Sequence, residues 1–148
     1  MCGIAGILSS DIDLRGEKLL VEKMGKTLKK RGPDAAGLYL TPEVALVHRR
    51  LSVIDVENGA QPMHFGKYVI VYNGEIYNTD EVRNELEGFG YRFDTHCDTE
   101  VVLKAYDKWG NESVKKLNGI FAYAIIFYAF VVAVKAPFFI PRVRDGCC

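Results

Sequence analysis

The chain has 148 residues, of which 49% are hydrophobic, with 19 basic and 19 acidic side chains. This length and balance predict one globular domain and exclude two full ones. A formal net charge of zero excludes bulk electrostatic attraction as the main reason to bind nucleic acid or an anionic membrane. Function is therefore expected to reside in a specific site.

The cysteines and the N-terminal sequence indicate the compartment. Cys2, Cys97, Cys147 and Cys148 match neither a disulfide framework nor the spacing of a zinc site, so no metal is expected. No signal-peptide pattern opens the chain, which favours reduced thiols and a cytoplasmic location. The apolar run 120–134 is shorter than the roughly 20 residues that a membrane-spanning helix needs, so it is interpreted as buried strands.

The first half of the chain alternates strand and helix patterns. A buried strand is predicted over 2–8, followed by a helix over 17–30 in which apolar residues recur every fourth position. Three strands rich in Val, Leu, Ile and Tyr are predicted over 37–40, 43–53 and 67–72. Turn residues separate them, which favours an antiparallel meander.

The second half is predicted to contain two helices and a return to strand. Asn78, with Glu81 three residues later, is a capping pattern for a short helix that Gly88 ends. Asp98 or Thr99 is expected to cap the next helix, which ends at 110, and strand is expected from 120 onward. Strands at both ends with helices between them predict a layered α+β domain.

Cys2 is the most informative residue. If Met1 is removed, this residue carries both a thiol and a free α-amine, whose ordinary pKa of about 7.7 to 8.0 suits a general base near neutral pH. The neighbouring thiol is then easily activated as a nucleophile. The alternative is a small buried cysteine at the start of a strand.

Asn73 and Gly74 form the second candidate feature. Most Asn-Gly pairs are turns. Acyl transfer, however, requires donors directed at a developing oxyanion, and an asparagine amide with an adjacent glycine N–H supplies two. Glu75 places an anion beside these donors, which suits a cationic group.

Arg50 and Asp98 would singly be a surface cation on a strand and a helix cap. Together with Glu75 they allow a more specific use. An α-amino acid carries a carboxylate and an ammonium, which require a guanidinium and acidic acceptors. These three side chains are the right set to hold such a ligand.

Six segments, in this order, resemble the class II glutamine amidotransferase domain, and most of all the N-terminal glutaminase domain of glutamine-hydrolysing asparagine synthetases. They are MCGIAG (1–6), RGPD (31–34), HRRLSVID (48–55), GAQP (59–62), YNGEIYN (72–78) and DTEV (98–101). The resemblance covers residues 1–126, and 127–148 is then a divergent C-terminal tail of the same domain. It implies an N-terminal-nucleophile hydrolase fold, a four-layer αββα sandwich of antiparallel sheets.

The resemblance also implies roles for individual residues. Cys2 would be the nucleophile, with its own amine as base, and Asn73 and the Gly74 N–H would form the oxyanion hole. Arg50 would bind the glutamine carboxylate, and Glu75 and Asp98 its ammonium. The pocket would also be lined by Leu51, Ser52, Val53 and Ile54. The three histidines and Cys97 receive no catalytic role and are expected to be structural or surface residues.

The tail departs from the resemblance after residue 126, and a pyrophosphate-binding loop of a synthetase domain is absent from this sequence. ATP and Mg²⁺ are expected only for such a domain, which would receive the ammonia. The apolar tail favours a homodimer, while the alternative is that it folds back as edge strands of the second sheet. A non-catalytic remnant that binds glutamine or a protein partner is the alternative function.

Overall fold

The computed structural model describes residues 2–52, 59–127 and 130–136, which form two antiparallel sheets. The first, sheet A, has the strand order β1-β3-β2 and contains β1 (Gly3–Leu8), β2 (Ala35–Leu40) and β3 (Val44–Arg50). The second, sheet B, has the order β4-β5-β6-β7. Its strands are β4 (Met63–Phe65), β5 (Tyr68–Ile76), β6 (Gly119–Phe127) and β7 (Phe130–Ala136).

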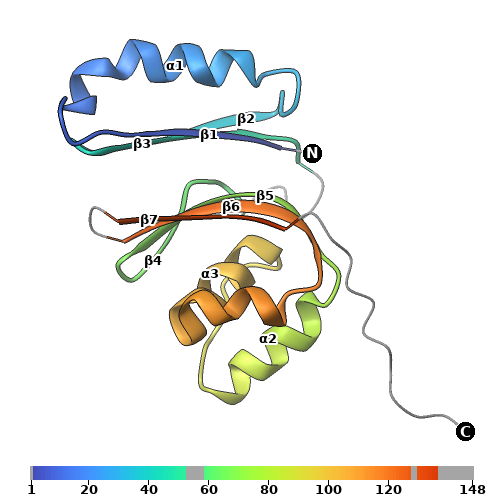
Figure 1. Cartoon of the computed structure of the whole chain (residues 1–148). Helices are drawn as coiled ribbons and strands as arrows, with labels where there is room; N and C mark the ends of the chain where they lie inside the picture. The colour runs from blue at the N-terminus through green and yellow to red at the C-terminus, as the bar shows by residue number, and fades with distance from the viewer. Residues whose placement is uncertain (1, 53–58, 128–129, 137–148) are drawn as a thin grey trace, which may run out of the picture.

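Helices cover the outer face of each sheet. The 3-10 helix η1 (Leu14–Glu17) and α1 (Lys18–Thr27) precede β2, and α1 lies over sheet A in Figure 1. Between β5 and β6 the chain forms α2 (Thr79–Gly88), α3 (Asp98–Trp109) and the 3-10 helix η2 (Gly110–Lys116), and α2 and α3 lie below sheet B. The four layers confirm the predicted αββα sandwich.

Three buried layers of apolar side chains hold the sandwich together. Val21 packs against Val47 between α1 and sheet A. Leu46 and Val71 belong to a cluster between the two sheets, and Val102 of α3 packs against the outer face of sheet B. Burial of such side chains is the main stabilising term for a fold of this size.

Strand alternation on β3 decides which side chains face the space between the sheets. Even-numbered Val44 and Leu46 contact sheet B, whereas Val47 packs toward α1. Arg49 follows the α1 side, and its Nε donates a 3.0 Å hydrogen bond to the carbonyl of Gly25 in that helix. By the same alternation Arg50 points to the side of sheet B. The adjacent side chains of Arg49 and Arg50 therefore lie on opposite faces of sheet A.

The predicted three-strand meander is wrong. β2 and β3 pair as expected, but β5 belongs to the other sheet, where it pairs with β4 and β6. Asn73 and Gly74 also form no turn, since β5 runs through both of them to Ile76. Local turn signals could not show this because the sheet to which a strand belongs depends on contacts distant in sequence.

The predicted helix caps are confirmed only in that Asn78 occupies the N-cap position of α2. Asn78 makes no side-chain cap, and its amide instead bridges the Lys116 carbonyl and the Asn118 N–H, at 2.9 and 2.8 Å. The residue that precedes α3 is Cys97, so Asp98 is the first helical residue. The prediction that α3 stops at Gly110 is confirmed, and the positive φ of 56° explains the glycine.

Residues 130–136 form an edge strand of sheet B, with β7 paired to β6. This agrees with the alternative that the tail folds back onto the second sheet, while 137–148 lie outside the described residues. Within the described part of the chain, no helix is long and apolar enough to cross a membrane.

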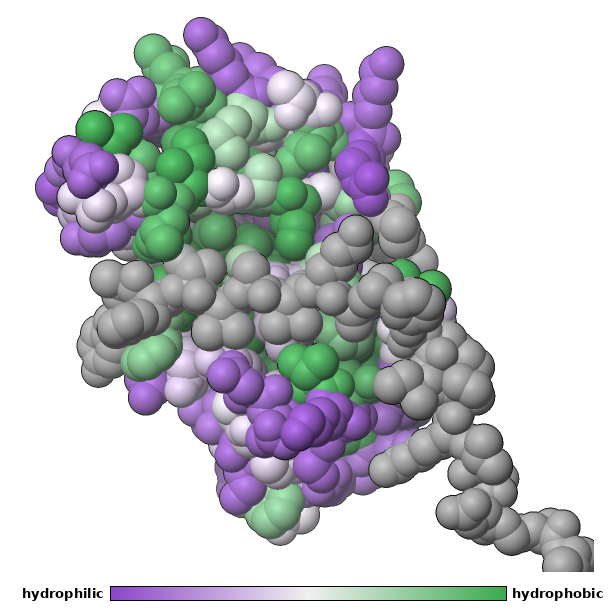
Figure 2. Space-filling view, in the orientation of Figure 1, coloured by the Kyte–Doolittle hydropathy of each residue, from purple (hydrophilic) through white to green (hydrophobic). Residues whose placement is uncertain are grey.

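Exposed apolar side chains gather on the layer formed by α1 and sheet A, as the green surface in the upper part of Figure 2 shows. Leu8, Ile12, Leu19, Leu20 and Leu38 are 38 to 75% exposed. Exposed apolar side chains that cluster in this way favour association with another protein surface. They lie on the face opposite to the helices of sheet B.

Candidate active site

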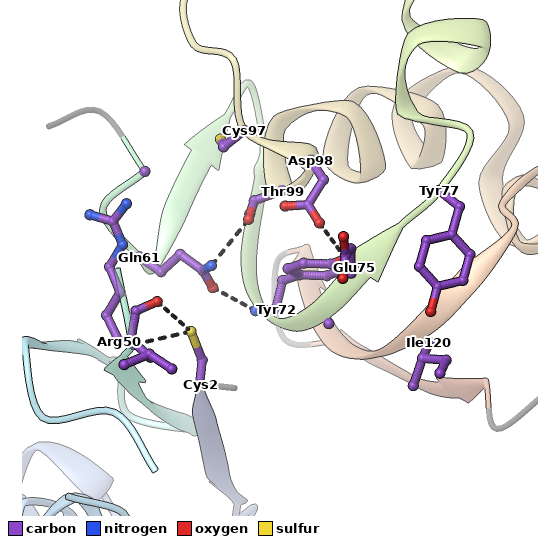
Figure 3. Close-up of a pocket in the computed structure, with 13 residues that line it drawn as sticks. Cys2, Arg50, Gln61, Tyr72, Glu75, Tyr77, Cys97, Asp98, Thr99 and Ile120 are labelled. Carbon is purple, nitrogen blue, oxygen red and sulfur yellow. Dashed lines mark hydrogen bonds between the residues drawn. The ribbon is translucent and has the colours of Figure 1, made fainter. Parts of the chain in front are cut away.

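A cavity of about 260 Å³ opens where Cys2, the ends of β3 and β5, and the start of α3 meet. Figure 3 shows Cys2 and Arg50 on one side of it and Asp98 and Glu75 on the other. Its lining is made by Cys2, Arg50, Leu51, Gly59, Gln61, Tyr72, Gly74, Glu75, Tyr77, Cys97, Asp98, Thr99 and Ile120.

Cys2 is half-buried at the entrance of β1, with its thiol at the cavity. The backbone N–H of Leu51 donates to its Sγ at 3.4 Å, and the Leu51 carbonyl lies 3.7 Å from the same sulfur. The Cys2 carbonyl accepts a 3.1 Å hydrogen bond from Nε of Arg31. Contacts to both the side chain and the backbone of Cys2 therefore fix the position of the thiol.

Arg50 ends β3 and is 8% exposed, so the alternative of a surface cation is wrong. It lines the cavity on the same side as Cys2. Among the described residues that line this cavity, its guanidinium is the only basic side chain. Because a buried guanidinium favours an anionic partner, this side of the cavity suits a carboxylate.

The loop after β3 is placed in part. Leu51 lines the cavity, and the N–H of Ser52 donates a 2.7 Å hydrogen bond to Oδ2 of Asp34. Val53 and Ile54 lie outside the described residues. The RGPD segment thus contacts Cys2 through Arg31 and the loop after β3 through Asp34.

Gly74 lines the cavity, whereas Asn73 is not among its lining residues. Asn73 shares with Val71 the side of β5 that faces sheet A. Its Oδ1 is buried without a hydrogen-bond partner in the part of the chain that the structure describes. A Cβ on Gly74 would lie 2.5 Å from the Cα of Phe121 in β6, so this position excludes a side chain.

The opposite side of the cavity is acidic. Glu75 is exposed at the rim, and Asp98 is half-buried at the start of α3. Burial raises the pKa of Asp98 above its ordinary value, although a hydrogen bond from the Tyr72 hydroxyl acts in the other direction. A buried carboxylate of this kind gains from a cationic ligand.

Sequence reasoning assigned no function to several residues that line the cavity, namely Gly59, Gln61, Tyr72, Tyr77, Cys97, Thr99 and Ile120. Gln61, Tyr72 and Thr99 do lie within the GAQP, YNGEIYN and DTEV segments, so the segments themselves were the available signal. Cys97 is 4% exposed, in agreement with the predicted packing role.

His48 is 1% exposed and is not among the residues that line the cavity. Burial lowers the pKa of His48 to about 4, although a hydrogen bond to the backbone of Tyr72 acts to raise it. A neutral, enclosed imidazole agrees with the predicted structural role. In the described ranges no group of three or more His, Cys, Asp or Glu side chains is arranged to hold a metal ion.

Comparison with known protein families shows to which family the chain belongs. The model of the glutamine amidotransferase domain matches residues 1–129. The chain belongs to this family. It is a class II glutamine amidotransferase domain, homologous to the glutaminase domain of asparagine synthetases, as the resemblance predicted.

Curated relatives of this amidotransferase domain include asparagine synthetase 3 of Bacillus subtilis (strain 168), 43% identical over 129 residues that make up 84% of this chain and 21% of the relative. Asparagine synthetase B of Escherichia coli (strain K12) is 37% identical over 127 residues, 84% of this chain and 23% of the relative. The chain thus spans about a fifth of the length of these relatives.

A solved structure similar to the amidotransferase domain is glutamine phosphoribosylpyrophosphate amidotransferase from B. subtilis in complex with ADP and GMP. The TM-score is 0.69 at 19% sequence identity, and the match covers 90% of this chain and 36% of that one. At this identity the likeness establishes the fold. It agrees with the N-terminal-nucleophile hydrolase sandwich.

Proposed function

We propose that this domain hydrolyses L-glutamine to glutamate and ammonia through a γ-glutamyl thioester on Cys2. The observation that carries the proposal is the cavity, in which the Cys2 thiol and the buried Arg50 lie on one side and the acidic pair Glu75 and Asp98 on the other. A single α-amino acid has the two charges that this arrangement requires.

Acylation follows from the chemistry of the N-terminal residue. Once Met1 is removed, the free amine of Cys2 accepts the thiol proton, and the sulfur forms a bond to the amide carbon of glutamine. The oxyanion accepts hydrogen bonds from the Asn73 amide and the Gly74 N–H. When the tetrahedral intermediate collapses, the C–N bond breaks and the amine's proton leaves with ammonia.

Deacylation repeats these steps with water. The Cys2 amine accepts a proton from water as the oxygen bonds to the thioester carbon, and the C–S bond breaks to release glutamate and return the thiol. Because the same oxyanion forms again, Asn73 and Gly74 serve both halves of the reaction.

Substrate binding divides along the two sides of the cavity. Arg50 pairs with the carboxylate of glutamine, and Glu75 and Asp98 receive its ammonium. The segment of Leu51, Ser52, Val53 and Ile54 completes the pocket, in part through its backbone groups.

The ammonia is proposed to serve an acceptor domain. In the asparagine synthetase type this would be an ATP-dependent domain that amidates aspartate, and ATP and Mg²⁺ would bind there rather than here. We place this reaction in the cytoplasm. A homodimer of this chain, with residues after 126 contributing, stays a prediction that light scattering of the purified chain tests.

The test combines intact mass with glutamate release. A chain without Met1 is expected to release glutamate from glutamine and to accumulate a γ-glutamyl adduct on Cys2 after acid quenching. Cys2→Ala is expected to abolish both. Release that persists in Cys2→Ala, or an inert chain whose mass shows that Met1 has been removed, would refute the proposal.

A second candidate function is binding of glutamine without turnover. The position of Asn73 favours it, because this residue is not among those that line the cavity. Calorimetry that finds glutamine binding by the chain without Met1, together with no glutamate release, would establish this alternative.

A further inference from the structure

The carboxamide of Gln61 joins a strand to a helix at the cavity. Its Oε1 accepts a 2.6 Å hydrogen bond from the N–H of Tyr72, and its Nε2 donates at 3.1 Å to Oγ1 of Thr99. Figure 3 shows this side chain reaching across to both partners. Tyr72 belongs to β5 and Thr99 to the first turn of α3.

The strand side of this bridge replaces a missing sheet contact. On this edge of β5, β4 pairs only with residues from Tyr68 to Ile70. The N–H of Tyr72 lies beyond that pairing, and the Gln61 carboxamide takes the place of a strand carbonyl. Tyr72 and Thr99 are 2 and 3% exposed, so a lost partner here would leave buried polar groups unpaired.

Sheet A leaves room for the backbone of residue 61. A Cβ added to Gly37 in β2 would overlap the Gln61 carbonyl oxygen and lie 2.8 Å from Cδ of Pro62. Only glycine permits this approach. The bridge is therefore supported from sheet A as well.

Both elements joined by Gln61 carry residues of the proposed pocket. Tyr72 directly precedes Asn73 and Gly74, and Thr99 directly follows Asp98. A second connection runs from the Tyr72 hydroxyl to Oδ2 of Asp98 at 2.7 Å. Two contacts thus fix the Asp98 carboxylate relative to the backbone of β5.

We infer that Gln61 is a positioning residue that sets the separation between the Asp98 carboxylate and the oxyanion-binding end of β5. This separation must match the length of glutamine from its ammonium to its side-chain amide. The inference rests on the proposed glutaminase function. Gln61 does not touch the thiol, so it governs recognition of the amino acid and not the intrinsic reactivity of Cys2.

Two reagents for Cys2 separate these effects. Iodoacetamide has no amino-acid group, whereas 6-diazo-5-oxo-L-norleucine carries the ammonium and carboxylate of glutamine. With the second reagent the sulfur bonds to the diazo carbon, which takes the thiol proton as dinitrogen leaves. The ratio of the two labelling rates, read by intact mass, reports positioning apart from thiol reactivity.

Gln61→Met fills similar space without either hydrogen bond. We expect it to lower the rate of labelling by 6-diazo-5-oxo-L-norleucine, relative to the rate with iodoacetamide, roughly 10- to 100-fold. Thr99→Val should lower it less, because the contact to Tyr72 remains. The double variant should match Gln61→Met alone, since both changes remove the same bond. Gln61→Glu, which keeps an acceptor for Tyr72, should recover part of the ratio.

Thr27→Val is the matched control, because Thr27 is exposed at the end of α1 and its ratio should equal that of the parent. An unchanged ratio in Gln61→Met, or equal loss with both reagents, would overturn the inference. A different outcome would refute the proposed function, and the inference with it. In that outcome iodoacetamide labels the parent chain without Met1, but 6-diazo-5-oxo-L-norleucine does not.

Discussion

The Tyr72 hydroxyl donates a 2.7 Å hydrogen bond to Oδ2 of Asp98, which links β5 to the first turn of α3. Burial raises the pKa of Tyr72, which favours the protonated hydroxyl that donates this hydrogen bond. Burial also raises the pKa of Asp98, and this hydrogen bond limits the rise. One contact therefore affects both the position and the charge of the proposed ammonium site.

Tyr72→Phe is expected to lower kcat/KM for glutamine by the equivalent of about 1.5 to 3 kcal/mol, the usual contribution of a hydrogen bond to a charged group. Without the donor the pKa of Asp98 rises further, so the acidic limb of the kcat/KM profile should move to higher pH. Tyr91→Phe is the control, because it removes a 2.6 Å bond to Asp107 at the surface. A pH profile shared by parent and Tyr72→Phe would contradict the role of this contact.

Arg50→Lys tests the carboxylate site. An ammonium cannot reproduce the planar fork, so glutamine binding is expected to weaken by roughly 2 to 5 kcal/mol. The neighbouring Arg49 faces α1, where it bonds the Gly25 carbonyl, so Arg49→Lys should leave KM unchanged. Steady-state kinetics of the two variants measure this difference. Equal KM values for glutamine would contradict the proposal that Arg50 binds the carboxylate.

Buried His48 predicts a specific dependence of stability on pH. Its pKa is about 4 in the folded chain and about 6.5 when unfolded, so the unfolded state binds more protons between these values. The free energy of unfolding should therefore be fully retained above pH 6.5 and fall as the pH drops toward 4, by up to about 1.4 kcal/mol per pH unit.

Urea unfolding at pH 7.5 and 5.5 measures this effect. His48→Gln should reduce the difference between the two pH values, whereas His64→Gln, which changes an exposed ring, should leave it unchanged. A pH difference that is the same in all three proteins would show that His48 does not cause it.

The buried pair of Glu100 and Lys104 holds the chain that leads into α3. Nζ of Lys104 lies 2.5 Å from Oε1 of Glu100, and the carboxylate also accepts the N–H groups of Asp94 and Thr95. Burial alone would raise the pKa of Glu100, but hydrogen bonds from Lys104 and Thr95 lower it below its ordinary value. These hydrogen bonds thus favour the ionised form of the buried Glu100 carboxylate.

Lys104→Met is expected to destabilise the fold by about 3 to 5 kcal/mol, because it leaves a buried carboxylate without its cation. Adding Glu100→Gln should recover part of this loss. The exposed pair of Lys115 and Glu112 has a similar 2.6 Å separation, and Lys115→Met should change stability by less than about 1 kcal/mol. Denaturant unfolding that finds the two lysine variants equal would contradict the importance of burial.

Much of the organisation followed from local sequence. Local sequence predicted the α+β class, the termination of α3 at Gly110 and the first strand. These features depend on periodicity and on the backbone preferences of neighbouring residues, and a short stretch of sequence contains both signals. The resemblance added the sandwich, which the structure confirms, and a proposed role for each motif. Cys2, Arg50, Leu51, Gly74, Glu75 and Asp98, all named from sequence, do line one cavity.

Tertiary structure alone decided which elements meet. The sequence could not assign β5 to the sheet opposite β3, because pairing partners are distant along the chain. Nor could it show that Gln61 completes the hydrogen bonding of Tyr72, that Arg49 and Arg50 face opposite layers, or that Asn78 binds the chain before β6 instead of capping a helix. A polar side chain has several equivalent local partners, and only the packing of the two sheets and α3 selects one of them.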